Sequence, residues 1–358
     1  MVRRGFNLPP PADRGRLDYW TSFMNSRFGG WGLVFAALLV VGCSREVPEP
    51  QAKSDRPANQ NIEKLPTRHL PNAVRVHAKV ISGGLPEGLP AFEELRSLGV
   101  KTVISVDGAL PDLASAEKCG LRYVHLPHGY DGIPATRAAE LAKAVRDLPG
   151  PIYIHCHHGK HRSPAAAATA CVAAGLIDHS AALTVLQIAG TSPHYRGLFE
   201  SAESAERLDQ ALLDQLHADF PATAKLPAMA EAMVTLEQTH EHLKAFEKAG
   251  WKQLPGKPDL TPEHEALLLR EHYAELLRTE VVQQQPDRFR QLLNAAETQA
   301  HKLEEALRSW NRTNGEGQLP GIVTAAFQAI NDNCKTCHQE FRDVPLSQKG
   351  VGVTPQAR

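Results

Sequence analysis

The pattern of apolar and polar positions divides the chain into an apolar leader, a polar stretch, a mixed region and a helical region. Residues 31–41 form an uninterrupted apolar run, and residues 44–70 are polar, contain four prolines and show no apolar periodicity. From about 76 to 205, short β-branched runs alternate with helix-like stretches, which predicts an α/β domain whose mostly parallel sheet is flanked by helices. The expected strands are 79–82, 102–106, 122–126 and 152–155, and the expected helices are 90–98, 112–119, 134–148 and 163–174.

After about residue 219 the strand signal disappears, and four amphipathic stretches follow at 226–249, 262–282, 286–312 and 321–342. The first of them places five side chains on one stripe at 4-3-4-3 spacing: Met229, Met233, Leu236, His240 and Leu243. Thr261 precedes Pro262 and is the expected N-cap of the second helix. We therefore predict that the α/β domain is followed by an all-α four-helix bundle.

The leader has the features of a targeting segment. Its apolar run is shorter than the ~20 residues needed to span a bilayer but fits the core of a signal peptide, although a buried strand or helix is the alternative. Residues 40–43 (Val-Val-Gly-Cys) resemble the lipobox of bacterial lipoproteins, which implies a lipidated Cys43 and a lipid anchor on the periplasmic side of a membrane. Either Met1 or Met24 could be the start, and the single charge before the core favours Met24.

These features predict five regions along the chain: a signal peptide (1–42), a lipidated Cys and flexible linker (43–75), an α/β domain (76–210), a helical bundle (220–345) and a tail (346–358). A length of 358 residues fits two domains. Lys and Arg number 39 against 40 Asp and Glu, so no dominant basic surface exists and nucleic acid is not the expected partner. Hydrophobic residues at 42% exclude wholesale disorder.

The first chemical site follows the expected strand 152–155. Cys156 ends that strand and Arg162 lies six positions on, so the spacing is Cys-x5-Arg. A loop of this length can surround a tetrahedral oxyanion with backbone N–H groups, while the following helix directs its positive end at the same point. That field favours the nucleophilic thiolate, Arg162 can hold two phosphate oxygens, and Ser163 can donate a hydrogen bond to the thiolate. Gly159 permits the tight turn.

This motif resembles the signature of cysteine-dependent phosphatases of the dual-specificity-like superfamily, and residues 159–162 (Gly-Lys-His-Arg) are most similar to the atypical plant and fungal branch. The resemblance covers about 130 residues, including 82–86 (Ser-Gly-Gly-Leu-Pro). It implies hydrolysis of phosphoric monoesters or inositol polyphosphates through a phosphocysteine, without a metal at that site. Pro164 departs from the usual Gly but suits a first helical turn. A loop that binds anions without turnover is the alternative.

The leaving oxygen needs a proton, which this family usually takes from an upstream Asp. Asp131 lies 25 residues before Cys156 and is the expected general acid. Asp107 is the second candidate. The alternative for Asp131 is a structural role in an Asp-Gly turn without catalysis. Four further loop residues are expected to bind substrate together with Gly159: His157, His158, Lys160 and His161. Their cationic character at mildly acid pH favours multiply charged phosphoesters.

The second chemical site is residues 334–338 (Cys-Lys-Thr-Cys-His), a Cys-x-x-Cys-His motif typical of covalent c-type haem attachment. A thioredoxin-like pair would follow a strand, and zinc would need a second ligand pair. The motif lies on the last helix of the predicted four-helix bundle, and this arrangement resembles the cytochrome c-prime family. The resemblance implies one haem c held by Cys334 and Cys337, with His338 as iron ligand and Arg342 as a charged neighbour.

The resemblance leaves the sixth haem ligand open. Met229 and Met233 are the candidates, and His240 and His242 are further candidates.

The leading expectation for the whole chain is an exported, lipid-anchored phosphatase whose haem is a redox or gas sensor or an electron carrier. The alternative is a haem electron-transfer or gas-binding lipoprotein whose first domain only binds anions. Expected partners are a phosphorylated protein or small polyphosphate, a redox partner or small gas, the membrane, and a second copy through the bundle. The roles of Cys119 and Cys171 stay open. They could be buried free thiols, form a disulfide with each other, or resolve an oxidised Cys156.

Overall fold

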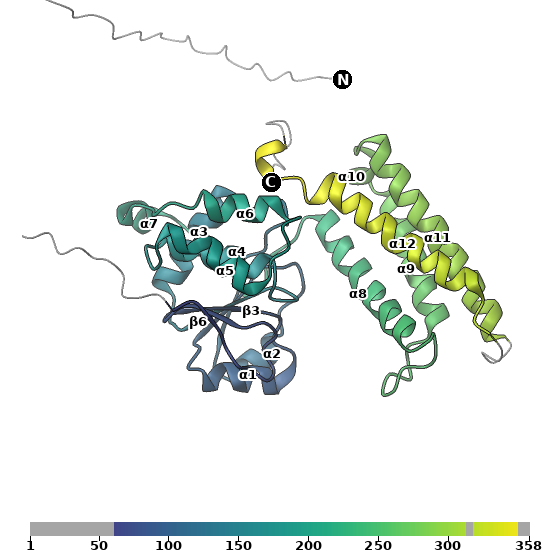
Figure 1. Cartoon of the computed structure of the whole chain (residues 1–358), viewed down its shortest axis with the longest axis horizontal. Coiled ribbons are helices and arrows are strands. Elements are labelled where there is room, and N and C mark those ends of the chain that lie inside the picture. Colours follow the sequence, from purple (N-terminus) through teal and green to yellow (C-terminus); the bar gives the residue numbers. More distant parts are fainter. Residues whose placement is uncertain (1–60, 313–317, 350–358) are drawn as a thin grey trace, which may run out of the picture. The chain divides into compact units, whose positions relative to one another are not determined.

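A six-stranded mixed sheet forms the centre of the first part of the protein in the computed structural model, which describes residues 61–312 and 318–349. These described residues belong to one compact unit. The strand order is β1-β2-β3-β6-β4-β5, with bounds Glu63–Lys64, Val74–His77, Val80–Gly83, Ile152–His155, Thr102–Ser105 and Arg122–His125. The neighbours β3, β6, β4 and β5 are parallel, as the sequence predicts. The edge strands β1 and β2 are antiparallel, so the sheet is mixed (Figure 1).

Both faces of the sheet are covered by apolar side chains, as the β-branched strand runs predict. Alternate residues of β6 point to opposite faces, so Ile152 and Ile154 join one buried cluster while Tyr153 joins the other. Helix α4 (Arg162–Ala173) packs on β2, β3 and β6 and is buried on all sides from Ser163 to Ala173. Its alanines allow this close packing between the sheet and its neighbouring helices α3 (Ala135–Asp147), α5 (Ala182–Ala189) and α6 (Arg196–Glu203).

The other helices of this part are short. Helices α1 (Gly88–Ser97) and α2 (Leu113–Lys118) contribute Phe92, Leu95 and Ala116 to the cluster around Tyr153. Helix α7 (Gln210–Gln215) and the turn η1 (His179–Ala181) complete the α/β part. The expected linker 43–75 ends earlier than predicted, because β1 pairs with β2 from Glu63 onward. The sequence did not reveal β1, since both of its residues are charged and exposed.

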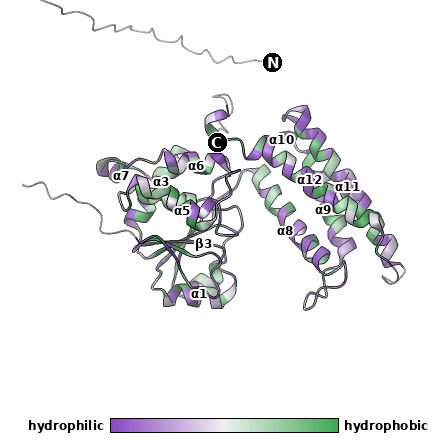
Figure 2. Ribbon diagram, viewed as in Figure 1, coloured by the Kyte–Doolittle hydropathy of each residue, from purple (hydrophilic) through white to green (hydrophobic). Residues whose placement is uncertain are grey.

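The second part contains the four long helices that the sequence predicts. They are α8 (Ala228–Lys248), α9 (Pro262–Arg278), α11 (Asp287–Asn311) and α12 (Gly321–Cys337), with a short α10 (Glu280–Gln283) after α9. Each long helix carries hydrophilic and hydrophobic residues side by side (Figure 2). Leu236 and Leu243 of the predicted stripe are buried in the core. Thr261 is the N-cap residue of α9, but its side chain makes no capping hydrogen bond.

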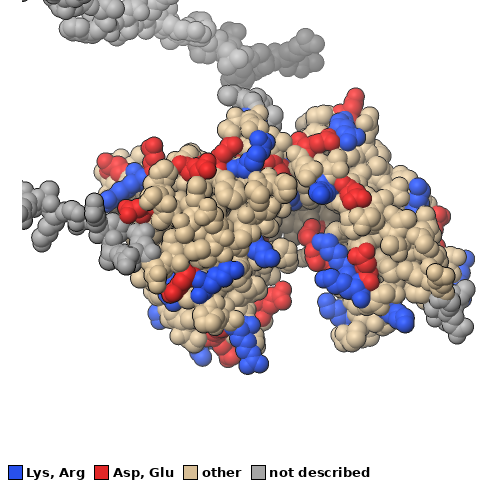
Figure 3. Space-filling model, viewed as in Figure 1, with Lys and Arg blue, Asp and Glu red and all other residues tan. Residues whose placement is uncertain are grey.

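After α12, a π-helical turn η2 (His338–Arg342) and a 3-10 turn η3 (Leu346–Gln348) continue the chain. Residues 346–349, which the sequence assigns to a tail, are therefore structured. The leader, Cys43 and Met24 lie outside the described residues. Within the described residues, no helix is long and apolar enough to cross a membrane. Acidic and basic side chains are interspersed on the face that Figure 3 shows, as the balanced composition predicts.

Acid should destabilise the α/β part through His155. Its buried ring lies 2.5 Å from the Tyr123 hydroxyl, and burial lowers the pKa of His155 to about 4. Between about pH 4 and 6.5 the unfolded chain binds more protons than the folded chain, so the free energy of unfolding falls as the pH drops through this window. A lowering of the His155 pKa from 6.5 to about 4 corresponds to a loss of about 3 kcal/mol in the free energy of unfolding across this window.

The test of this prediction is denaturant unfolding at pH 7 and pH 4.5. We expect His155→Gln to lose less stability than the wild type between these pH values, because the substituted side chain does not titrate. The exposed His69 supplies the control, and His69→Gln should show the wild-type loss. An unchanged pH dependence in His155→Gln would contradict this role of His155.

Candidate functional site

The Cys-x5-Arg motif occupies the junction between a buried strand and a buried helix. Strand β6 ends at His155, Cys156 follows with 3% of its surface exposed, and α4 begins at Arg162. The parallel strands β3 and β4 flank β6 on either side. The loop 157–161 therefore lies at the carboxyl end of the central strands, where open α/β sheets place their ligand sites.

Three carbonyl groups of this loop are held from outside. Leu85 N–H donates to the carbonyl of His157 at 3.1 Å, and the Asn72 side-chain amide donates to that of Gly159 at 2.8 Å. The Thr191 hydroxyl donates to the carbonyl of Lys160 at 2.6 Å. In a trans peptide the next N–H points the opposite way. The N–H groups of residues 158, 160 and 161 therefore point to the inner side of the loop.

The inner side of the loop consequently presents free donors. Among the described residues, none of the backbone N–H groups of residues 157–163 donates to another backbone carbonyl. They lie at the N-terminus of a 12-residue helix, where the backbone dipole adds positive potential. Such an arrangement binds an oxyanion next to the Cys156 thiol.

Gly159 is required by both conformation and space. Its φ is +70°, and a Cβ at this position would lie 2.4 Å from Gly84 N and 2.5 Å from Gly83 C. A side chain would therefore push the loop away from the chain segment that follows β3. The predicted role of Gly159 as a turn residue agrees with this geometry.

Arg162 is positioned by an aromatic ring. Its guanidinium carbon lies 4.5 Å from the centre of the Tyr130 ring, and its Nε is buried without a hydrogen-bond partner among the described residues. Burial lowers the pKa of Arg162, but the charges of Tyr130, Cys156 and Asp107 outweigh this and raise it above its ordinary value. A charged guanidinium with a buried free donor beside a thiol fits an anionic ligand. This contact of Tyr130 was not predicted from the sequence.

Ser163 is close to the nucleophile, as predicted. Its Oγ lies 3.3 Å from Cys156 Sγ and donates to the carbonyl of Gly83 at 2.9 Å. Because its single O–H donates to Gly83, the hydroxyl here accepts from the Cys156 thiol, and it can donate to a thiolate once it turns from the Gly83 carbonyl towards Sγ.

The two candidate acids differ in their surroundings. Asp131 lies on the loop after β5, one residue after Tyr130, and its carboxylate forms an ion pair with Lys349 at 2.7 Å. Asp107 follows β4 and is 2% exposed. One of its oxygens accepts from Ala109 N–H at 3.0 Å, and the other is buried without a partner among the described residues. Its charge also acts on Arg162, so Asp107 contributes to the electrostatics of the site.

His161 does not supply the positive charge that the sequence predicts for this loop. Burial and the neighbouring His158, Arg162 and Lys160 lower the pKa of His161 to about 4. Burial and His157 also lower the pKa of His158. His161 is therefore neutral at mildly acid pH and packs at a tilt against two aromatic rings, with its ring centre 4.6 Å from that of Tyr195 and 6.3 Å from that of Tyr130. The expectation of a strongly cationic loop at mildly acid pH is wrong for His161.

The Cys-x-x-Cys-His motif lies at the C-terminal end of α12. Cys337 is buried in the bundle core, Cys334 is partly buried one turn earlier, and the Tyr273 hydroxyl of α9 lies 3.3 Å from Cys334 Sγ. Both thiols are free. Burial, with Arg342 and His240, lowers the pKa of His338 to about 3, so its imidazole is neutral and able to bind a metal ion. The described residues contain no preformed group of three or more His, Cys, Asp or Glu that could hold a metal ion.

The candidate sixth ligands have different environments. Met229 and Met233 are partly buried against the bundle core. His240 Nε2 donates to the Asn331 side-chain oxygen at 2.7 Å, and His240 lies near enough to His338 to affect its pKa. His242 Nδ1 forms a 2.8 Å hydrogen bond with the carboxylate of the buried Glu265. Arg342, expected beside the haem, lies over the Tyr130 ring at 4.2 Å.

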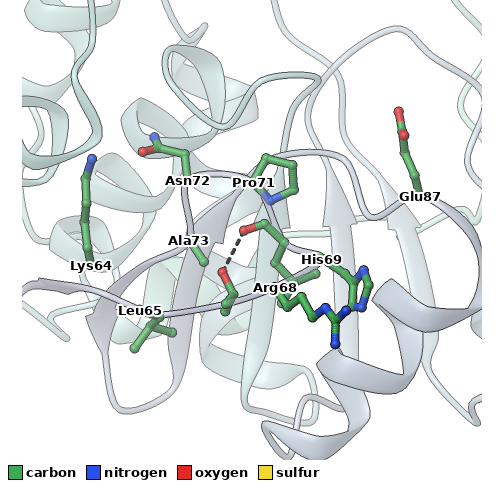
Figure 4. A pocket seen from close by; sticks show the side chains of 10 residues that line it. Lys64, Leu65, Arg68, His69, Pro71, Asn72, Ala73 and Glu87 are labelled. Carbon is green, nitrogen blue, oxygen red and sulfur yellow. Dashed lines mark hydrogen bonds between the residues drawn. The ribbon is translucent and has the colours of Figure 1, made fainter.

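A further pocket of about 490 Å³ lies beside β1 and β2 (Figure 4). Arg68 and His69 donate their backbone N–H groups to Glu94, and the pocket wall includes Asn72, which braces the Cys156 loop. None of the sequence-predicted site residues lines it. Its lining is Lys64, Leu65, Thr67, Arg68, His69, Leu70, Pro71, Asn72, Ala73 and Glu87.

No protein-family model and no curated protein matches the chain. Among solved structures, it is similar to P. aeruginosa TpbA, with 23% identity over 42% of this chain and 92% of TpbA and a TM-score of 0.36. It is also similar to the core catalytic domain of the PP-IP phosphatase SIW14 from S. cerevisiae, with 16% identity, 43% and 93% coverage and a TM-score of 0.34. A putative phosphatase (DUF442) from Shewanella putrefaciens CN-32 is 21% identical, with 38% and 90% coverage and a TM-score of 0.31.

Loss of one outer brace should weaken anion binding. Thr191→Val removes the hydroxyl that holds the Lys160 carbonyl, leaving that carbonyl unpaired at a cost of about 1–3 kcal/mol. We expect roughly 10-fold weaker competitive inhibition by phosphate or vanadate, because the loop N–H groups lose their fixed direction. Thr169→Val is the matched control, since Thr169 bonds to Ser201 and not to the loop. Equal weakening in both variants would assign the effect to general destabilisation.

Proposed function

We propose that the α/β part hydrolyses phosphoric monoesters or small polyphosphates through a phosphocysteine intermediate. The observation that carries this proposal is that, among the described residues, the backbone N–H groups of residues 157–163 donate to no backbone carbonyl and the buried Nε of Arg162 has no hydrogen-bond partner. A neutral ligand would leave these donors and this charge uncompensated. A phosphoryl group supplies three oxygens to accept from them, and the thiol supplies a nucleophile at the same point.

The reaction takes two steps. In the first, Cys156 Sγ attacks phosphorus, the P–O bond to the leaving group breaks, and the Asp131 carboxyl gives its proton to the leaving oxygen. Arg162 and the loop N–H groups stabilise the charge of the transferring phosphoryl group. In the second, water attacks the phosphocysteine, the Asp131 carboxylate takes the proton from that water, and the S–P bond breaks. Ser163 then donates its hydrogen bond to the departing thiolate.

The bundle is proposed to carry one covalent haem. Cys334 and Cys337 lie one turn apart on α12 with His338 directly after them, and the neutral imidazole of His338 could bind the iron of a haem held by the two thiols. Cys334 and Cys337 would form the thioether bonds and His338 would bind the iron. A haem held there supplies reversible one-electron chemistry or gas binding. We further propose that Cys43 is lipidated and anchors the exported protein to a membrane.

The thiolate mechanism predicts distinct effects for two variants. Cys156→Ser should lose turnover while still binding vanadate or phosphate, since a hydroxyl keeps the loop geometry but is a far weaker nucleophile. Asp131→Asn should slow hydrolysis of alkyl phosphates by about 10²–10⁴-fold and that of p-nitrophenyl phosphate much less. Phosphopeptides and inositol polyphosphates, tested with haem oxidised and reduced, define the substrate class. Full activity in Cys156→Ser would exclude the mechanism and favour a site that only binds anions.

The haem assignment predicts a covalent link. Protein matured in a host competent for cytochrome c assembly should retain haem after denaturation and acid-acetone extraction, because thioether bonds survive both. Cys334→Ala with Cys337→Ala should lose it, whereas Cys171→Ala, which removes a thiol buried under the sheet, should keep it. An open sixth position gives high-spin ferrous iron that binds CO, and a Met229 or Met233 ligand gives a low-spin spectrum. Absence of covalent haem from the wild type would exclude the assignment.

A further inference from the structure

The segment that follows the haem motif returns to the candidate general acid. We call residues 342–349 the C-terminal segment. Leu346 N–H donates to the backbone carbonyl of Asp131 at 2.8 Å, and Lys349 Nζ donates to its carboxylate at 2.7 Å. Both the backbone and the side chain of Asp131 are therefore held by one short stretch of chain.

The residue before Asp131 is held by the same segment. Arg342 lies 4.2 Å from the centre of the Tyr130 ring, and Arg162 lies 4.5 Å from the centre of the same ring. Two guanidinium groups thus share one aromatic ring, one from the phosphate loop and one from the turn after α12. Leu346 also lies against Gly132, where a Cβ would be 3.4 Å from the leucine side chain.

Contacts to α6 anchor the segment on its other side. Ser347 Oγ donates to Glu200 at 2.7 Å, and Arg196 donates to the Gln348 side chain at 3.1 Å. The segment is thus fixed to the α/β part through α6 as well as through the Asp131 loop. Its position does not depend on a single side chain.

These contacts conflict with acid catalysis. One oxygen of the Asp131 carboxylate accepts from the Lys349 ammonium, so that oxygen is occupied and is not available to a leaving group. The loop that must reach the phosphoryl group is held by a segment from outside the α/β part.

We propose that the C-terminal segment is an autoinhibitory latch that holds Asp131 away from proton transfer and releases it when the Lys349 ion pair opens. This proposal rests on the proposed function, in which Asp131 is the general acid. The ion pair is partly exposed, with side-chain exposure of 37% for Lys349 and 20% for Asp131. Because water and salt reach it, the latch is weak enough to open reversibly.

The experiment compares latch variants of the full chain, purified with its haem, on an alkyl phosphate and on p-nitrophenyl phosphate. Lys349→Met should raise turnover of the alkyl phosphate by about 2- to 5-fold, the range that an exposed ion pair supports. Lys349→Glu should raise it further through repulsion. The rise should be smaller on p-nitrophenyl phosphate, whose leaving group needs little protonation. Lys302→Glu on α11 makes the same charge change away from the segment and should leave turnover unchanged.

Two further measurements separate the latch from other effects. In the Asp131→Asn background, Lys349→Glu should have no effect, since the group that it releases is gone. Raising the ionic strength should increase wild-type turnover and leave that of Lys349→Met unchanged. Leu346→Pro removes the N–H that holds the Asp131 carbonyl and provides a second route to the open state without changing charge.

The outcomes distinguish the latch from the proposed function. Unchanged or lower turnover in both Lys349→Glu and Leu346→Pro, in a protein whose wild-type turnover depends on Cys156, overturns the latch alone. A rise that persists in the Asp131→Asn background also overturns it. Absence of Cys156-dependent turnover from the wild type and from every latch variant overturns the proposed function, and the inhibitory role with it.

Discussion

The orientation of a few peptide groups around Cys156 determines what the α/β part can do. The carbonyls of residues 157, 159 and 160 are drawn outward by Leu85, Asn72 and Thr191, so the N–H groups that follow them face inward. Without these outer donors the loop could rotate its peptide groups, and the N–H groups would no longer face inward. The conformation of Gly159 and the all-round burial of α4 serve the same arrangement, because they fix where the loop begins and ends.

The features that could be predicted from the sequence alone are those that depend on residues close together in the chain. The four parallel strands lie within two residues of their predicted bounds because each is a short buried run between turn signals, and Cys156, Arg162 and Ser163 meet because their spacing is short. Strands β1 and β2 were missed because Glu63–Lys64 carries no apolar residue and the apolar–polar alternation of β2 lasts for only four residues. Pairing with a neighbour, and not residue type, makes them strands.

The contacts that complete the site connect residues far apart in the chain. Asn72 is 87 residues from Gly159, and Lys349 is 218 residues from Asp131. No periodicity or spacing reveals such pairs, since only the folded topology brings them together. The loop histidines show the same limit, because a neutral His161 results from burial and from nearby cations that the sequence does not place.

Neutral histidines alter the electrostatics expected of the site. With His161 uncharged, the positive potential at the loop comes from its backbone dipoles, from Lys160 and from Arg162, whose ring partner Tyr130 also contacts Arg342. Arg342 belongs to the turn after α12, four residues beyond His338. A division of the chain into an independent α/β domain and an independent bundle is therefore too simple, because Arg342, at the end of the predicted bundle, contacts the same tyrosine ring as Arg162 of the Cys156 loop.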